Sequence, residues 1–394
     1  MALIAAAVCL CATSLGFIWS GALGWGSAAL WVFALSGLLI VLGAIQGGAP
    51  ASCSPPLNSP PLGPLSPRGH QVLALGIILF GAALRIYRWD EIPAGIWSDE
   101  LLGAANGVRL LEAPRPPFGT LPLVPEWPLW VPTFNLYSYF AAGVLWLFGV
   151  GHAGVKALSI LPGVLSLPAL YCLARGLSRG AIGPWVGAFA TLPLALSRWG
   201  LPQSRFEWDA TLHITLVLWA LAALAHGLRG RRWWLMALGG TILGIAQFTY
   251  LASRLSAAGA IAGLLLAFIL GLPGGRRVHL PGLGAFALAF ALAASPVVYT
   301  SLHDEDRAKA RIEQLQLSEG GIFGDLDTIK ENLWIYARAL AIEGPTNARQ
   351  NIPRAPLMPK PLLALALIGG LLSLHPRSRI MGLVLWGVGG ASML

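Results

Sequence analysis

Two adjacent carboxylates, Asp99 and Glu100, are the residues of this sequence best placed to do chemistry. They follow Ser98, a preferred helix-capping residue, and would occupy the first turn of a helix, where the helix dipole favours negative charge. A carboxylate that is partly desolvated at a membrane surface is also a better proton acceptor, as a general base must be. The pair therefore has a structural interpretation, an acidic helix start, and a functional one, a catalytic base.

The residues around this pair indicate a membrane surface. Arg85 and Arg88 end the apolar stretch before it, and Trp89 and Trp97 would wall it. After the pair, apolar residues recur at helical spacing and form one face: Leu101, Ala105, Val108 and Leu111. We expect a short amphipathic helix that lies on the outer leaflet and carries its carboxylates at the N-terminal end.

A second polar loop, residues 198–209, contains Arg205, Glu207 and Asp209. Asp209 begins an otherwise apolar stretch, and an ionisable residue at the boundary of a membrane span is a candidate functional residue. The alternative is an interfacial ion pair between an arginine and Asp209, flanked by tryptophan anchors.

Both loops belong to a chain of 394 residues, of which 56% are hydrophobic and only 11% are charged. A soluble domain would carry about a quarter charged residues, so the composition excludes a soluble enzyme and a disordered protein. The net charge of +9 then indicates basic cytoplasmic loops rather than nucleic-acid binding. The four cysteines have no ligand-like spacing, which excludes a disulfide-rich scaffold.

The elements that must position these residues are membrane helices, each needing roughly 20 mostly apolar residues. We predict an all-α bundle of about eleven spans, because suitable stretches occupy 4–22, 27–45, 71–88, 153–174, 181–198, 208–228, 233–251, 255–272, 279–300, 361–375 and 380–394. The last two are short, as expected either of a truncated chain or of a short family member. A further apolar stretch, 134–150, is expected to lie in the interface or to re-enter.

Loop charges orient the predicted spans. Ten arginines and no acidic residue occupy the short loops near 68, 175–179, 229–232, 276–277 and 377–379, which the positive-inside rule places in the cytoplasm. All 17 acidic residues lie within 90–126, 207–209 and 304–343, on the opposite face if the spans alternate. The predicted protein is a multi-pass protein of the plasma or inner membrane with its polar site facing outward.

The predicted organisation has five parts. They are two N-terminal spans (1–45), a Pro/Ser/Gly-rich cytoplasmic linker (46–69), a catalytic membrane module (70–300) with its first external loop at 88–134, a second external loop (301–360) and C-terminal spans (361–394). In the second external loop, residues 333–338 are expected to form an amphipathic helix that returns to the membrane.

No cofactor is indicated by the sequence. A divalent metal at the carboxylates of residues 304–327 is the weaker alternative to a solvated helix with ion pairs. No histidine pair has the spacing of a zinc site, and no phosphate-binding glycine motif is present.

Several motifs occur in a characteristic order along residues 70–390. They are Ile92-Pro93-Ala94-Gly95 before Asp99-Glu100, Tyr137-Ser138-Tyr139, Leu147-Phe148-Gly149, Leu196-Ser197-Arg198 with Arg205 and Asp209, Gly244 with Phe248-Thr249-Tyr250 and Arg254, and residues 344–353, which include Asn347 and Arg349. This order resembles the GT-C glycosyltransferases, in particular the protein O-mannosyltransferase and aminoarabinose transferase group (glycosyltransferase family 39-like). The chain differs from the better-known members in its shorter length and in its two additional N-terminal spans.

The resemblance implies transfer of a hexosyl or pentosyl group from a polyprenyl-phosphate carrier to a lipid, glycan or protein acceptor in the cell envelope. It implies an inverting single displacement, with Asp99 as the base, Glu100 as its neighbour and Asp209 as a second polar anchor. The leaving phosphate calls for converging guanidinium groups. The implied substrate-binding residues are Arg85, Arg88, Arg205, Glu207, Tyr250, Arg254, Asn347 and Arg349, with Lys156, Arg198 and Arg354 behind them.

Two other classes of function remain open on the sequence alone. A transporter or flippase of lipid-linked saccharides would show internal repeats and polar residues near mid-membrane, whereas here the ionisable residues gather on one face. A polysaccharide polymerase or ligase would also use external basic residues, with its main loop placed late in the chain.

Overall fold

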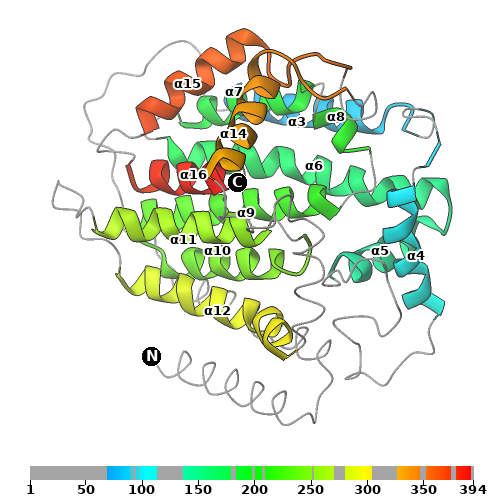
Figure 1. The fold of residues 1–394 in the computed structure, drawn as a ribbon, viewed down its shortest axis with the longest axis horizontal. Coiled ribbons are helices and arrows are strands. Elements are labelled where there is room, and N and C mark those ends of the chain that lie inside the picture. Colours follow the sequence, from blue (N-terminus) through cyan, green and yellow to red (C-terminus); the bar gives the residue numbers. More distant parts are fainter. Residues whose placement is uncertain are drawn as a thin grey trace.

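The computed structural model describes residues 69–89, 91, 95–96, 98–112, 136–178, 183–197, 200–205, 209–250, 253–269, 280–303, 326–346, 352–373 and 379–391. Within these ranges the chain is helical and contains no strand. The helices, shown in Figure 1, are α3 (Gly69–Ile86), α4 (Ser98–Glu112), α5 (Leu136–Phe148), α6 (His152–Leu177), α7 (Gly183–Leu196), α8 (Gly200–Gln203), α9 (Asp209–Gly230), α10 (Trp233–Ala246), α11 (Ser253–Ile269), α12 (Leu280–His303), α14 (Leu326–Ala341), α15 (Lys360–Ser373) and α16 (Arg379–Ala391).

Each apolar stretch predicted within the described ranges forms a helix whose ends differ from the prediction by a few residues. Among the described helices, three, α3, α6 and α9, are long and apolar enough to cross a membrane. The count of about eleven spans stays a prediction, and the stretches 4–22 and 27–45 and the linker 46–69 lie almost entirely outside the described residues.

The stretch predicted not to cross the membrane forms α5, a helix of 13 residues. At 1.5 Å per residue it is about 20 Å long, which is shorter than the roughly 30 Å hydrocarbon core. That α5 lies in the interface or re-enters stays a prediction.

Two side-chain contacts fix the relative direction of α6 and α9. The Thr215 hydroxyl donates to the carbonyl oxygen of Pro162 (2.8 Å), and His226 Nε2 lies 2.9 Å from the carbonyl oxygen of Cys172. Both helices therefore run the same way, because the partners occur in the same order along each. Their N-termini consequently lie at the same end of the bundle (Figure 1).

The helices pack side by side around a core of medium-sized apolar residues. In Figure 1, α12, α10, α9 and α6 follow one another across the bundle, α3 and α7 lie beyond α6, and α16 packs on α11. Leu221, Leu224, Met236 and Leu243 are buried where α9 meets α10. This packing holds the ends of several helices in a fixed arrangement.

Pairs of glycines four residues apart bring two helix pairs into close contact. A Cβ atom added to Gly240 would lie 2.2 Å from the carbonyl oxygen of Phe286, and one added to Gly244 would lie 2.6 Å from the Cβ atom of Ala293. Gly259 meets the carbonyl oxygen of Gly387 on α16 in the same way. Small residues at this spacing allow membrane helices to pack backbone against backbone.

We predict that Gly240→Leu lowers the apparent Tm of the purified protein in detergent. The new side chain would have to displace the backbone of α12, and overpacking of this kind costs about 1–3 kcal/mol. Gly284→Leu on the same α12 is the matched control, because nothing lies within 4 Å of a Cβ atom at that position. Equal thermal stability of the two variants would contradict the close packing of α10 on α12.

Candidate functional site

One end of the bundle, which we call the polar end, gathers Arg85, Glu100, Lys156, Arg205 and Asp209. The first turn of α4 is bonded to the start of α6 by an ion pair, described below. The start of α9 is bonded to α8, because the Thr211 hydroxyl donates to the carbonyl oxygen of Gln203 (3.0 Å). Since α6 and α9 are parallel, their N-termini lie at this end together with the start of α4 (Figure 1).

Glu100 and Lys156 form a buried ion pair between α4 and α6. Lys156 Nζ donates to Glu100 Oε2 at 2.7 Å, and the two residues are 0% and 1% exposed. An isolated charge could not be buried so deeply, and removing one partner of a buried pair costs about 3–5 kcal/mol. The contact fixes the start of α4, whose position the sequence predicts, on the first turns of α6.

The rest of α4 packs on α5 through small residues. Ala104 is buried, and a Cβ atom added to Gly107 would lie 2.9 Å from the Cβ atom of Ala141. The predicted apolar face behaves differently, because Leu101 is 49% and Leu111 is 38% exposed. An apolar face left open beside an apolar bundle is what a helix lying in the membrane interface would present to lipid.

Arg85, one of the expected substrate-binding residues, is completely buried. Its guanidinium donates to the Ser204 hydroxyl (3.0 Å) and to the carbonyl oxygens of Gly81 (3.0 Å), Leu194 (3.1 Å) and Ala195 (3.5 Å). These bonds join α3 to the end of α7 and to the turn after α8. Its burial and bonding argue against direct contact with a substrate and give it a role in holding the polar end together.

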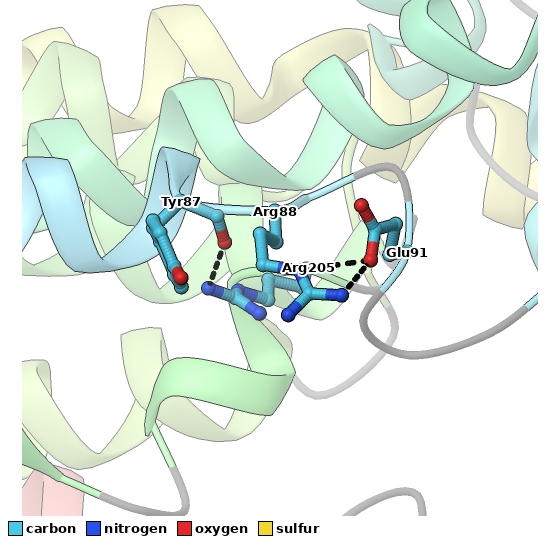
Figure 2. A network of polar contacts seen from close by, with 4 residues as sticks. All are labelled: Tyr87, Arg88, Glu91 and Arg205. Atoms are coloured by element: carbon cyan, nitrogen blue, oxygen red, sulfur yellow. Dashed lines mark hydrogen bonds and ion pairs between the residues drawn. The ribbon is translucent and has the colours of Figure 1, made fainter.

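Arg205 caps the C-terminal end of α3. Its Nη2 atom donates to the carbonyl oxygen of Tyr87 (2.7 Å), as Figure 2 shows, and to that of Leu84. A cation there donates hydrogen bonds to carbonyl oxygens that the helix end leaves unpaired, and its charge complements the helix dipole. Partial burial lowers the pKa of Arg205 below its usual value, while the guanidinium stays charged at neutral pH.

Arg88 lies beside Arg205 on the surface and pairs with Glu91 (Figure 2). Its Nε atom donates to Glu91 Oε2 at 2.8 Å, and both side chains are about half exposed. The backbone of Arg88 is left-handed, with φ of 47°, and this turns the chain at the end of α3. Of the two arginines at the end of α3 that are expected to bind substrate, Arg85 and Arg88, it is therefore Arg88 that is accessible from the surface.

The start of α9 lies against the start of α11, which brings further predicted residues into one neighbourhood. Asp209 is the first residue of α9, and His213 follows it one turn later. The ring of His213 lies 6.2 Å from that of Tyr250, and its Nε2 atom is 3.3 Å from the Ser256 hydroxyl oxygen. Arg254 is the second residue of α11 and is half-buried. Asp209, Tyr250 and Arg254 therefore belong to the same end of the α9–α11 pair.

Other predicted residues lie outside what the structure describes. Asp99 belongs to the first turn of α4, but its side chain is outside the described residues, as are Glu207, Asn347 and Arg349. Their assignments stay predictions.

The predicted second external loop contains a helix where one was expected, because residues 333–338 lie within α14. Leu333, Trp334, Ile335 and Tyr336 are exposed there.

The residues near 304–325, which carry most of the predicted acidic cluster, lie outside the described ranges. Within those ranges no group of three or more potential metal ligands occurs, and Asp327 pairs with Lys330 (2.8 Å).

The opposite end of the bundle carries four described arginines of the predicted cytoplasmic loops, Arg175, Arg229, Arg231 and Arg232. Arg229 donates to the carbonyl oxygens of Arg175 (3.1 Å) and Ser178, which joins the C-terminal ends of α9 and α6. Arg231 and Arg232 are exposed beside them. The structure therefore separates these arginines from Glu100 and Asp209 by the length of α6 and α9.

Three contacts at the polar end were not predicted. Lys156 was expected among the secondary phosphate ligands, whereas it bonds to Glu100. A lysine in the otherwise apolar stretch Gly154–Leu158 was the available signal, because such a charge needs a partner. Nothing in the sequence pointed to the contacts of Ser204 with Arg85 and of Ser256 with His213, because serines are common in short loops and in apolar helices.

The sequence matches no known protein family, and no curated protein is significantly similar to it. Among solved structures, the Archaeoglobus fulgidus oligosaccharyltransferase tethered with an acceptor peptide is 13% identical, with a TM-score of 0.41, over 83% of this chain and 49% of that chain. An oligosaccharyltransferase from the same organism, in complex with an inhibitory peptide and a dolichol-phosphate, is 13% identical, with a TM-score of 0.43, over 82% and 50%.

The chain thus spans about half the length of the structures that it resembles. The likeness is distant and assigns no function to this chain. The O-mannosyltransferase or aminoarabinose transferase subgroup stays a prediction, since the similar structures are oligosaccharyltransferases.

We predict that Arg85→Met lowers the free energy of unfolding by about 3 kcal/mol, because buried carbonyl oxygens of α7 would lose their donors. Thermal unfolding in detergent would measure the loss. Arg88→Met is the matched control, since its exposed ion pair is worth about 1 kcal/mol or less. If both variants unfold at the wild-type temperature, the buried guanidinium does not hold these helices together.

Proposed function

We propose that this protein is an integral-membrane glycosyltransferase that moves a sugar from a polyprenyl-phosphate carrier to an acceptor at the polar end of the bundle. The observation that supports the proposal most directly is the shared location of the α4 start and the α9 and α11 starts. That location brings the helix turn containing Asp99 to the end that also holds Asp209 and Arg254. A transferase with an anionic lipid donor needs carboxylates for the acceptor and arginines for the donor phosphate, both near a membrane surface.

In the proposed reaction, Asp99 takes the proton of an acceptor hydroxyl as its oxygen attacks the anomeric carbon of the sugar. The bond between that carbon and the phosphate oxygen breaks, and the electron pair leaves with the polyprenyl phosphate. A single displacement of this kind inverts the anomeric centre. Asp209, with Glu207 as the alternative, would orient the sugar or the acceptor.

The departing phosphate gains negative charge, so guanidinium groups are its expected partners. Arg254 is the first candidate, because it lies half-buried one turn after Tyr250 at the start of α11. Arg205 and Arg88 follow, and Arg205 already donates to the carbonyl oxygens that end α3. Arg349 and Asn347 complete the proposed set from the second external loop.

The finer assignment follows the sequence resemblance. We propose a GT-C enzyme of the O-mannosyltransferase or aminoarabinose transferase type, which transfers a hexosyl or pentosyl group. The polar end would face outward from the plasma or inner membrane, because the arginine-rich opposite end satisfies the positive-inside rule. The acceptor would be a lipid, glycan or protein of the cell envelope.

The test is transfer by the purified full-length protein in detergent, with a radiolabelled polyprenyl-phosphate sugar and an envelope extract as the source of acceptor. We expect Asp99→Asn to lower the rate about 100-fold or more, as loss of a general base does, while the protein stays folded. Asp327→Asn is the matched control, since that carboxylate is exposed and pairs locally with Lys330.

Two results would count against the proposal. Equal rates of polyprenyl-phosphate release by the wild type and Asp99→Asn would remove Asp99 from the mechanism. Movement of an intact lipid-linked sugar across vesicles, without release of the carrier phosphate, would favour a flippase instead.

A further inference from the structure

We propose that Lys156 is a positioning residue for the transfer reaction, acting through Glu100 to hold the first turn of α4. This inference rests on the proposed function, because that turn contains the proposed base, Asp99. It concerns a residue on a different helix, 56 positions further along the chain than Glu100.

The pair is a close, fully buried contact. Lys156 Nζ lies 2.7 Å from Glu100 Oε2, and neither residue reaches the surface. Lys156 is the fifth residue of α6, whereas Glu100 is the third residue of α4. The ion pair therefore ties the beginning of a short helix to a longer helix that is packed on both sides by α7 and α9.

Stability alone gives a poor reason for this pair. Burying two charges costs desolvation energy that their attraction only partly returns, and an apolar pair of similar volume is often as stable. In addition, no described residue donates to the second carboxylate oxygen of Glu100, Oε1, although that atom is buried. What a buried ion pair does provide is a fixed alignment of one helix against the other, because the two charges meet in only one alignment.

Among the described side chains in the first turn of α4, Glu100 is buried against α6 and Leu101 is exposed. The close approach of Gly107 to Ala141 lies two turns further along α4 and anchors its middle. Leu101 and Leu102, which follow Glu100 directly, are 49% and 38% exposed. Without the pair, the turn that contains Asp99 could move while the middle of α4 stayed packed on α5.

The same geometry argues against Lys156 as a phosphate ligand. Its charge is already neutralised by Glu100, and its complete burial removes it from any substrate that enters from the surface. Its effect on the reaction would therefore pass through the position of α4.

The experiment measures kcat and the donor KM of the full-length protein for Lys156→Met, Glu100→Gln and the double variant. We expect kcat to fall about 100-fold in each, as a displacement of about 1 Å in a reacting group can produce, with the donor KM nearly unchanged. Because both residues act through one contact, the double variant should lose no more than either single variant. Lys156→Arg, which keeps the charge, should recover part of the rate.

Leu167→Ala is the control for general destabilisation, because this residue is on the same helix and fully buried, but faces α3 and α7. It should lower the Tm without lowering kcat. Multiplied losses in the double variant, or an unchanged kcat in Lys156→Met, would overturn the positioning role. If Lys156→Met is not recovered folded, Lys156→Arg and Glu100→Gln make the same comparison.

Hydrogen–deuterium exchange of residues 98–112 separates failure of this inference from failure of the proposed function. We expect exchange in the first turn of α4 to rise about tenfold in Lys156→Met and to stay at the wild-type rate in Leu167→Ala. Unchanged exchange in Lys156→Met would overturn the inference whatever the activity. If the wild type transfers no sugar, the proposed function and the catalytic consequence of the pair both fail, while increased exchange would still show that the pair holds α4.

Discussion

The cost of placing an ionised side chain in an apolar interior determines where this protein can keep its polar chemistry. Among the described residues, the charged side chains of Arg85, Glu100 and Lys156 are nonetheless buried almost completely. Each has a partner that offsets part of this cost, since Lys156 bonds to Glu100 and Arg85 donates to a hydroxyl and three carbonyl oxygens. All three lie at one end of the bundle, so the bonds that make their burial tolerable also join the ends of separate helices.

Packing of the helices follows a different rule from the bonding at their ends. Along their length, α10 and α12 approach through Gly240 and Gly244, and α11 and α16 approach through Gly259. These contacts are close and carry no charge, so they set distances between helices without bringing reactive groups together. The ion pair and the buried arginine then fix the ends of α3, α4, α6 and α7, where a reaction could take place. The division lets an apolar scaffold present polar groups at a single surface.

The positions of the described helices could be predicted from the sequence, because runs of apolar residues end at arginines, prolines or acids. The start of α4 at Ser98 was predictable for the same reason, since a capping residue precedes two carboxylates. The partners of the buried charges were not predictable. Glu100 and Lys156 are 56 residues apart, and only the packing of α4 and α6 brings them together. The burial of Arg85 was not predictable either, because a cation at the end of a span suggests a surface ligand, whereas the fold buries it against α7.

Sidedness is the claim on which the proposed chemistry depends, and cysteine labelling tests it most directly. The four native cysteines would be replaced by serine, and single cysteines introduced at Arg88 and at Arg231, which are exposed at opposite ends of the bundle. With intact cells and a membrane-impermeant maleimide, we predict labelling at position 88 and no labelling at position 231 until the membrane is permeabilised. Labelling of both positions from the same side, or of position 231 alone, would contradict an outward-facing site built from the starts of α4, α9 and α11.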